Sequence, residues 1–354
     1  MPGWGITIAD AGTKGKLLCC DVARTGECCL CIQDFSDPRV LSCRFGEGKG
    51  VGMMIGDKGK GFLEGNEIWA HKKTCLQVHG GADPRISASK IYGGYSEGVS
   101  FGGGASRGRL EYTEIWGHAG CGLRISEGAA PLITGNVLLC SMCNVGILGC
   151  SPLLTGNSIH SAGSSLPAGR GRDGSCAGVE ITGSGTRCRL EGNFVFRNSG
   201  FNIKIGLGAD PYILKNSIYE GPARGVFFST LSTTGTLRDN DISAHGKSEV
   251  EIVEGASPLL QGNTIHGGRG NGVLVFGRLT GGRIFNNSIF DFPSSGHCLY
   301  VAESLSLEIT GNKISGAGAD GVFVADGSRC LIKDNEILAC GECAVVVQRG
   351  SDPL

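Results

Sequence analysis

A six-residue pattern recurs along the chain, usually at intervals of 23 or 24 residues. It consists of an aliphatic residue, any two residues, a small polar residue, one further residue and an apolar residue, as in Leu63 to Ile68. A fixed period of this length is typical of repeat proteins, in which each repeat packs on its neighbours. The closing apolar residue of the pattern is found at Val22, Phe45, Ile68, Ile91, Ile115, Leu138, Ile159, Val195, Ile218, Ile242, Ile265, Ile289, Ile314 and Ile337.

A second apolar segment follows each copy, with alternating apolar residues such as Gly272 to Val275, and a glycine-rich turn comes next. Alternation indicates a strand with one buried face. We therefore expect two short strands in each repeat and an all-β fold, a right-handed parallel β-helix (solenoid) of about fourteen coils. Residues 1–354 are predicted to form a single β-helix domain, truncated at both ends, with an inserted loop at residues 161–175 where the period breaks.

Asparagine is the usual small polar residue of the pattern. In a stack of coils these residues lie above one another, so we expect a ladder of side-chain amides with a structural role. The predicted ladder is Asn66, Asn136, Asn157, Asn193, Asn216, Asn240, Asn263, Asn287, Asn312 and Asn335.

The composition limits what the chain binds and where it acts. A net charge of −1 gives no broad attraction for nucleic acid, and the absence of a long apolar run predicts no membrane segment. Without a recognisable secretion signal, the 17 cysteines are expected to be thiols in the cytoplasm or nucleus. Cys28, Cys29 and Cys31 leave a small metal or redox site open, but we predict no metal and no cofactor.

The sequence motifs favour no catalytic residue. The Asp-Asp and Gly-His-Gly motifs of polygalacturonases are missing, and the Asp-Pro pairs at Asp37, Asp83 and Asp210 lack the histidine that follows in mannuronan epimerases. Glycoside hydrolysis needs paired carboxylates. The glutamates four residues before three of the closing apolar residues do not fall on adjacent coils, and a solvated strand face explains them: Glu64, Glu111 and Glu191.

Two features are candidates for binding. Aromatic residues cluster immediately after the closing apolar position, where they either stack on a ligand or pack on one another. The inserted loop carries Arg170 and Arg172, which could meet an acidic group. The aromatic stripe consists of Trp69, Tyr92, Trp116, His160, Phe196, Tyr219, His266 and Phe290.

Several repeats resemble those of a known protein family. Pro-containing coils alternate with Gly-x-Leu-Glu coils, and pairs end in Asn-Ser-Ile-His (Asn157 to His160) or Asn-Thr-Ile-His (Asn263 to His266). This is similar to the β-helix arm of the F-box only protein 11 family, the substrate-recruiting subunits of ubiquitin ligases. The resemblance implies a recognition arm without catalytic residues, and the chain lacks the family's F-box and zinc-binding box.

The sequence thus favours a non-enzymatic recognition module with a protein substrate or adaptor as its partner. The alternative is a carbohydrate-active β-helix, a polysaccharide lyase or hydrolase, or a sugar-binding repeat protein.

Overall fold

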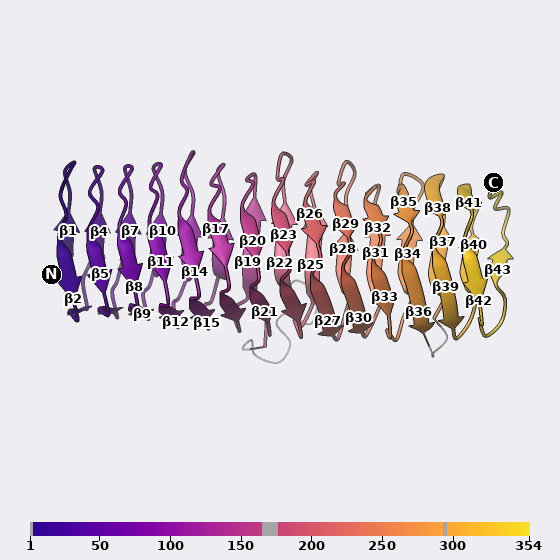
Figure 1. Cartoon of the computed structure of the whole chain (residues 1–354), viewed down its shortest axis with the longest axis horizontal. Helices are drawn as coiled ribbons and strands as arrows, with labels where there is room; N and C mark the ends of the chain where they lie inside the picture. Colours follow the sequence, from indigo (N-terminus) through magenta and orange to yellow (C-terminus); the bar gives the residue numbers. More distant parts are fainter. Residues whose placement is uncertain (1–2, 165–175, 293–295) are drawn as a thin grey trace. The chain divides into compact units, whose positions relative to one another are not determined.

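A computed structural model describes residues 3–164, 176–292 and 296–354 of the chain (Figure 1). These residues form β-strands and no helix, so none of them could cross a membrane as an apolar helix. Each turn of the chain adds one strand to each of three parallel sheets, sheets A, B and C, and there are about 14 such turns. The predicted parallel β-solenoid is confirmed.

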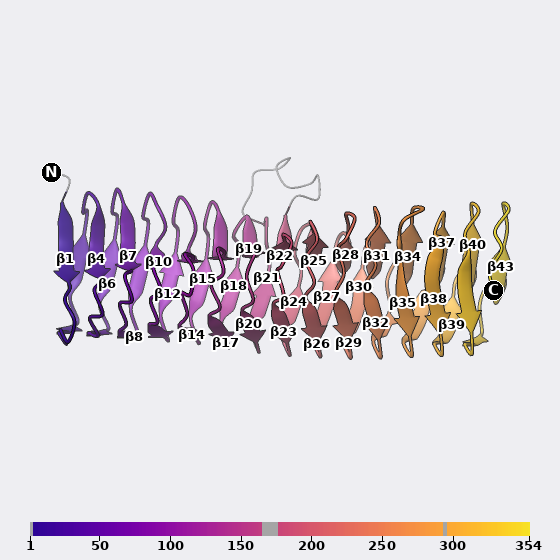
Figure 2. The same ribbon diagram turned by 90° about the horizontal axis from the view of Figure 1, so that it is seen from above.

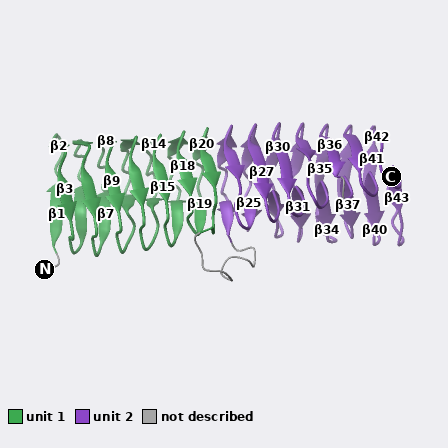
Figure 3. Ribbon diagram, turned by 90° about the horizontal axis from the view of Figure 1, so that it is seen from below, with its two compact units in different colours: residues 1–170 green, residues 171–354 purple. Residues whose placement is uncertain are grey.

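The chain divides into two compact units, residues 1–170 and residues 171–354 (Figure 3). Within each unit the strands of a sheet stack in chain order (Figure 2). In unit 1, sheet A contains β1 (Trp4–Ile8), β4 (Cys28–Ile32), β7 (Val51–Ile55), β10 (Leu76–Val78), β13 (Val99–Phe101), β16 (Cys121–Ile125) and β19 (Cys143–Leu148). Sheet B contains β2 (Lys16–Leu18), β5 (Arg39–Leu41), β8 (Phe62–Glu64), β11 (Arg85–Ser87), β14 (Arg109–Glu111), β17 (Leu132–Thr134) and β20 (Leu153–Thr155). Sheet C contains β3 (Asp21–Ala23), β6 (Arg44–Gly46), β9 (Glu67–Trp69), β12 (Lys90–Tyr92), β15 (Glu114–Trp116), β18 (Val137–Leu139) and β21 (Ser158–His160).

Unit 2 repeats this arrangement. Its sheet A contains β22 (Ala177–Thr182), β25 (Phe201–Gly206), β28 (Val226–Phe228), β31 (Val250–Val253), β34 (Val273–Phe276), β37 (Leu299–Ala302), β40 (Val322–Ala325) and β43 (Val345–Val347). Sheet B contains β23 (Arg189–Glu191), β26 (Tyr212–Leu214), β29 (Thr236–Arg238), β32 (Leu259–Gln261), β35 (Gly281–Phe285), β38 (Ser306–Thr310) and β41 (Cys330–Lys333). Sheet C contains β24 (Phe194–Phe196), β27 (Ser217–Gly221), β30 (Asp241–His245), β33 (Thr264–His266), β36 (Ser288–Phe292), β39 (Lys313–Ala317) and β42 (Glu336–Leu338).

The prediction of two strands per repeat was wrong, because the six-residue pattern spans two strands rather than one. In the third turn β8 ends at Glu64 and β9 begins at Glu67. The residue between them, Gly65, has a φ of 65°, in the left-handed region where the chain bends sharply. The bend directs Leu63 and Ile68 into the core from two different sheets, and each is only 1% exposed. Each coil therefore buries aliphatic side chains from three sides, which the coils above and below then cover.

The asparagines occupy this bend and bond from coil to coil. The backbone N–H and the side-chain amide of Asn240 both donate to Oδ1 of Asn263, at 3.0 and 2.9 Å. The same amide also donates to the carbonyl oxygen of Ile213, at 2.9 Å. Asn216 bonds to Asn240 in the same way, at 2.9 and 3.0 Å. A buried amide thus satisfies backbone groups that a bend would otherwise leave without partners.

A second buried polar column follows sheet C and includes His118. Its Nδ1 accepts a hydrogen bond from the backbone N–H of Gly94 at 3.2 Å, and its Nε2 lies 3.1 Å from the carbonyl oxygen of Ile91. One nitrogen accepts and the other donates, which is the pattern of a neutral imidazole. Burial lowers the pKa of His118 to about 4.

This histidine predicts a loss of stability in acid. Because its folded-state pKa of about 4 is below the value of about 6.5 for an unfolded chain, the unfolded state binds the extra proton first as the pH falls. Above about pH 6.5, His118 does not change the free energy of unfolding with pH. Between about pH 6.5 and 4, its titration lowers the free energy of unfolding by a total of about 3 kcal/mol. Urea unfolding of the chain and of His118→Gln at pH 7.5 and 4.5 measures it. We expect the free energy of unfolding to fall less between pH 7.5 and 4.5 in the variant than in the parent chain. Equal falls in the two proteins would contradict the depressed pKa of His118.

Candidate functional site

The aromatic stripe lies on the outer face of sheet C. In unit 1 the rings of Trp69 and Tyr92 are 6.4 Å apart and those of Tyr92 and Trp116 are 4.6 Å apart, with planes within 15° and 8° of parallel. The three residues occupy the same position on adjacent strands. The rings therefore stack on one another along the direction of coil stacking.

The stacked rings cover one another's faces, which are the surfaces on which a sugar ring or a peptide side chain would have to pack. The guanidinium of Arg44 lies 4.9 Å from the centre of the Trp69 ring, and Gly46 leaves the space that this ring fills. The Tyr92 hydroxyl donates to Glu67 at 2.6 Å. The half-buried stack thus forms cross-coil packing, which is worth about 1 kcal/mol per aromatic pair beyond burial. A binding role for the stripe stays a prediction.

The other predicted binding residues are not gathered into one place. In unit 2, Tyr219 stacks on Phe196 at 4.9 Å, and His266 stacks on Phe290 at 5.0 Å. In unit 1, Nδ1 of His160 lies 3.0 Å from the hydroxyl of Ser161. Arg170 and Arg172 of the inserted loop lie outside the described residues.

Sequence reasoning missed a row of cations on sheet B of unit 1. Adjacent strands β2, β5, β8, β11 and β14 place one outward residue each in the same register. Four of the five are exposed cations and the middle one is aromatic. We call this set the cation column: Lys16, Arg39, Phe62, Arg85 and Arg109.

A groove of about 440 Å³ lies at the start of the cation column. Its volume is in the usual range for a small-ligand site. Gly15 has no side chain and Pro38 has only a short ring, so the hollow lies between the longer side chains around them. Its walls are formed by Lys14, Gly15, Lys16, Asp37, Pro38, Arg39 and Phe62.

The cations of this groove have no acidic partner within the described part of the chain. No ion pair there involves Lys14, Lys16 or Arg39. Further along the column, Arg85 pairs with Glu111 at 3.1 Å and its guanidinium lies 5.7 Å from the centre of the Phe62 ring. Positive charge that the fold itself does not neutralise is available for a ligand.

The sequence did contain a signal for this column. A cation stands six residues before the closing apolar residue in four of these five coils, at Lys16, Arg39, Arg85 and Arg109. Four residues before the closing apolar residue, two positions further along the strand, the same coils hold residues such as Glu111, which drew attention to acidic side chains instead. Glu111 is nearly buried and serves Arg85 and Arg109 as a counter-ion, at 3.1 and 4.0 Å.

The cysteine cluster near the N-terminal end of unit 1 consists of buried thiols. Burial raises the pKa of Cys28 to about 12 and that of Cys31 to about 11, and it also raises the pKa of Cys29. Thiols with such pKa values are protonated at neutral pH. Among the described residues no three histidine, cysteine or carboxylate side chains come together as metal ligands.

The three-sheet coil and its asparagine ladder define a parallel β-helix, and comparison with known proteins agrees. The chain belongs to the right-handed β-helix family, whose pattern matches residues 28–195 and 231–354. No curated protein matches the chain.

Two solved structures share the fold at low sequence identity. The A-module of the Azotobacter vinelandii mannuronan C-5 epimerase AlgE4 is 13% identical with a TM-score of 0.54, and the match covers 90% of each chain. The Dettilon tailspike protein is 15% identical with a TM-score of 0.51, over 81% of this chain and 62% of that one. At these identities the likeness shows the fold alone.

Proposed function

We propose that the chain is a sugar-binding β-helix that holds an acidic polysaccharide in the groove on sheet B of unit 1. The observation that carries this proposal is the presence of three exposed cations without ion-pair partners beside an aromatic ring: Lys14, Lys16, Arg39 and Phe62. The proposal corresponds to the sugar-binding alternative predicted from the sequence, and not to the protein-recognition module that the sequence favours.

Each lining residue has a role in such a complex. The ring of Phe62 offers an apolar surface to the C–H face of a sugar. Lys16 and Arg39 attract the carboxylates, and the guanidinium can bond both carboxylate oxygens at once. Asp37 accepts hydrogen bonds from sugar hydroxyls. Adjacent strands of a sheet are about 4.8 Å apart, a distance comparable with one sugar residue, so an extended chain can meet a cation on successive coils.

The named substrate of one relative is in keeping with this ligand class. Mannuronan, the substrate in the name of the AlgE4 module, is a polymer of uronic acid residues. For this chain we propose binding rather than catalysis. Asp37 is the one carboxylate among the described residues of the groove, whereas glycoside hydrolysis uses two.

Calorimetric titration tests the proposal. Mannuronate and galacturonate oligomers and, as a neutral control, dextran oligomers of equal length are added to the whole chain. We expect the acidic oligomers to bind at least about tenfold more tightly than dextran, with an affinity that falls as salt is raised from 50 to 500 mM, because salt screens exposed charges. Equal affinities for acidic and neutral oligomers, or no binding of any, would overturn the proposal.

The protein-recruitment hypothesis stays a prediction. It rests on the resemblance of the repeats to the F-box family, and neither relative described above supports it. The cytoplasmic or nuclear location, expected because no secretion signal or membrane segment is visible, likewise stays a prediction.

A further inference from the structure

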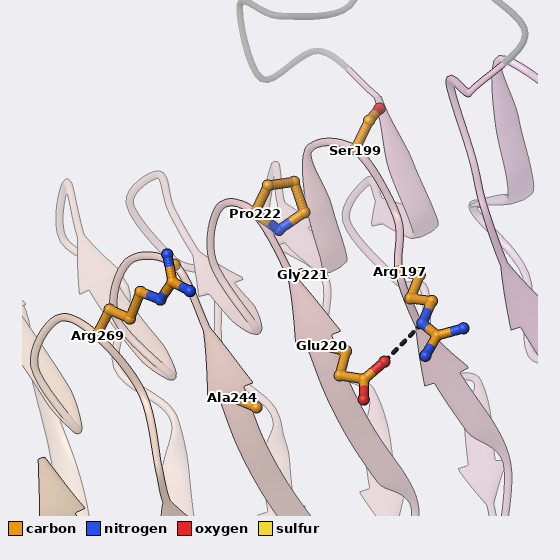
Figure 4. Close-up of a pocket in the computed structure, with 8 residues that line it drawn as sticks. Arg197, Ser199, Glu220, Gly221, Pro222, Ala244 and Arg269 are labelled. Carbon is orange, nitrogen blue, oxygen red and sulfur yellow. Dashed lines mark hydrogen bonds and ion pairs between the residues drawn. The ribbon is translucent and has the colours of Figure 1, made fainter.

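Unit 2 contains a second hollow, separate from the sheet B groove of unit 1. It lies over the turns that follow sheet C, has a volume of about 670 Å³ and is open to solvent (Figure 4). The residues that line it are Arg197, Ser199, Glu220, Gly221, Pro222, Ala244, Gly246 and Arg269.

The hollow results from small residues on one coil between larger ones on its neighbours. Three successive strands of sheet C are paired in register through Phe196, Tyr219 and Ser243. The residue after each of these therefore falls in one column, which consists of Arg197, Glu220 and Ala244. The side chain shortens from arginine and glutamate to alanine along this column. The coil of Ala244 also carries Gly246, whereas Pro222 and Arg269 stand on the coils on either side.

The floor of the hollow is rigid. Gly221 lies directly over His245, whose ring would be 3.0 Å from a Cβ at that position. His245 and Glu249 are both fully buried and hydrogen-bonded to each other, and Asn202 bonds to His245 Nε2 at 2.7 Å. Because these buried side chains are already hydrogen-bonded to one another, little conformational entropy is lost there when a ligand binds above them.

The charges around the hollow favour an anion. The Arg197 Nε donates to Glu220 at 2.5 Å, which leaves the terminal N–H groups of this guanidinium for another acceptor. Arg269, on the opposite side of the hollow in Figure 4, has no ion pair with any described residue. The Ser199 hydroxyl oxygen is buried and has no hydrogen-bond partner in the part of the chain that is described.

From this geometry we propose that the hollow is a binding site for a small molecule of monosaccharide size that carries an oxyanion, either a carboxylate or a phosphate. Arg269 holds the oxyanion, since a guanidinium group matches the geometry of both anions, and the terminal N–H groups of Arg197 bond the opposite end of the ligand. The Glu220 carboxylate accepts hydrogen bonds from the ligand's hydroxyls. A volume of about 670 Å³ is ample for such a ligand.

Two variants separate the charge of the site from its shape. Arg269→Ala removes the unpaired cation, and the side chain is exposed, so the fold should persist. Ala244→Gln fills the hollow without changing any charge. Its backbone has a φ of 63°, and Glu220 has a φ of 50° at the equivalent position of the neighbouring coil, so a long side chain is compatible with this conformation.

The test is calorimetric titration of the whole chain with inorganic phosphate, glucose 6-phosphate, glucuronate and glucose. We expect at least one anionic sugar to bind about tenfold or more tightly than glucose, and both variants to reduce that affinity by about tenfold or more. Preference for glucose 6-phosphate and inorganic phosphate identifies a phosphate site, and preference for glucuronate identifies a carboxylate site. Arg278→Ala is the matched control, because Arg278 is an exposed arginine of unit 2 that does not line the hollow.

No preference of the chain for any anion over glucose would overturn the proposal, as would binding that both variants leave unchanged. Either result leaves the polysaccharide groove unaffected, since its residues lie in unit 1 and its ligand is tested separately.

Discussion

Asn240→Ala is expected to lower the free energy of unfolding by about 3 kcal/mol or more. The substitution removes the acceptor of two bonds from Asn216 and the donor of bonds to Ile213 and Asn263. Asn240 is only 2% exposed, so water cannot replace these partners without opening the bend. Each buried polar group left unpaired costs about 1–3 kcal/mol. Urea unfolding followed by circular dichroism measures the loss.

A matched control is Asn286→Gly. Asn286 is exposed, and the same place in other coils is held by glycine, for example Gly262 and Gly311, which like Asn286 have positive φ. We expect this variant to unfold within about 0.5 kcal/mol of the parent chain. Similar losses in the two variants would show that the ladder contributes no special stability.

The double variant Lys16→Glu with Arg39→Glu is expected to weaken binding of acidic oligosaccharides by about a hundredfold. Each substitution replaces an attraction with a repulsion, and exposed pairs of this kind contribute up to about 1 kcal/mol each. Neither side chain has an ion-pair partner among the described residues, so the fold should lose little stability. Titration with mannuronate oligomers at low salt measures the change.

The control changes the same net charge elsewhere in unit 1. Lys72 and Lys73 are exposed on the turn after sheet C and do not line the groove. Lys72→Glu with Lys73→Glu should reduce affinity by only a fewfold, through long-range repulsion that salt screens. Equal losses in the two double variants would mean that net charge, not the groove, determines binding.

The repeat was readable from the sequence because a solenoid imposes one spacing on every coil. The period placed Ile68 on Ile91, and it placed the asparagines in one column, where Asn240 now bonds to Asn263. The third strand was not readable, because the sharp bend occurs within a pattern whose apolar ends look like one strand. The left-handed conformation of Gly65 reveals it.

The binding surfaces required the structure. Trp69 and Tyr92 occupy the same position on adjacent strands, as the period predicts, but only ring positions show that their faces stack on one another. The cation column follows the same period as the core, yet its significance depends on whether Arg39 has an acidic partner. Ion pairing between coils cannot be read from spacing alone, since Arg85 in the same column does have one. The prediction of one domain over residues 1–354 stays untested.

The most direct test of the account locates a bound oligouronate on the chain. A carbodiimide couples carboxylates to nearby lysine amines, so the complex with a mannuronate oligomer is treated and its sugar-bearing peptides are identified by mass spectrometry. We predict that the adducts lie on Lys14 and Lys16, which line the groove. Adducts confined to lysines away from the cation column, such as Lys247 or Lys313 in unit 2, would contradict the proposed site.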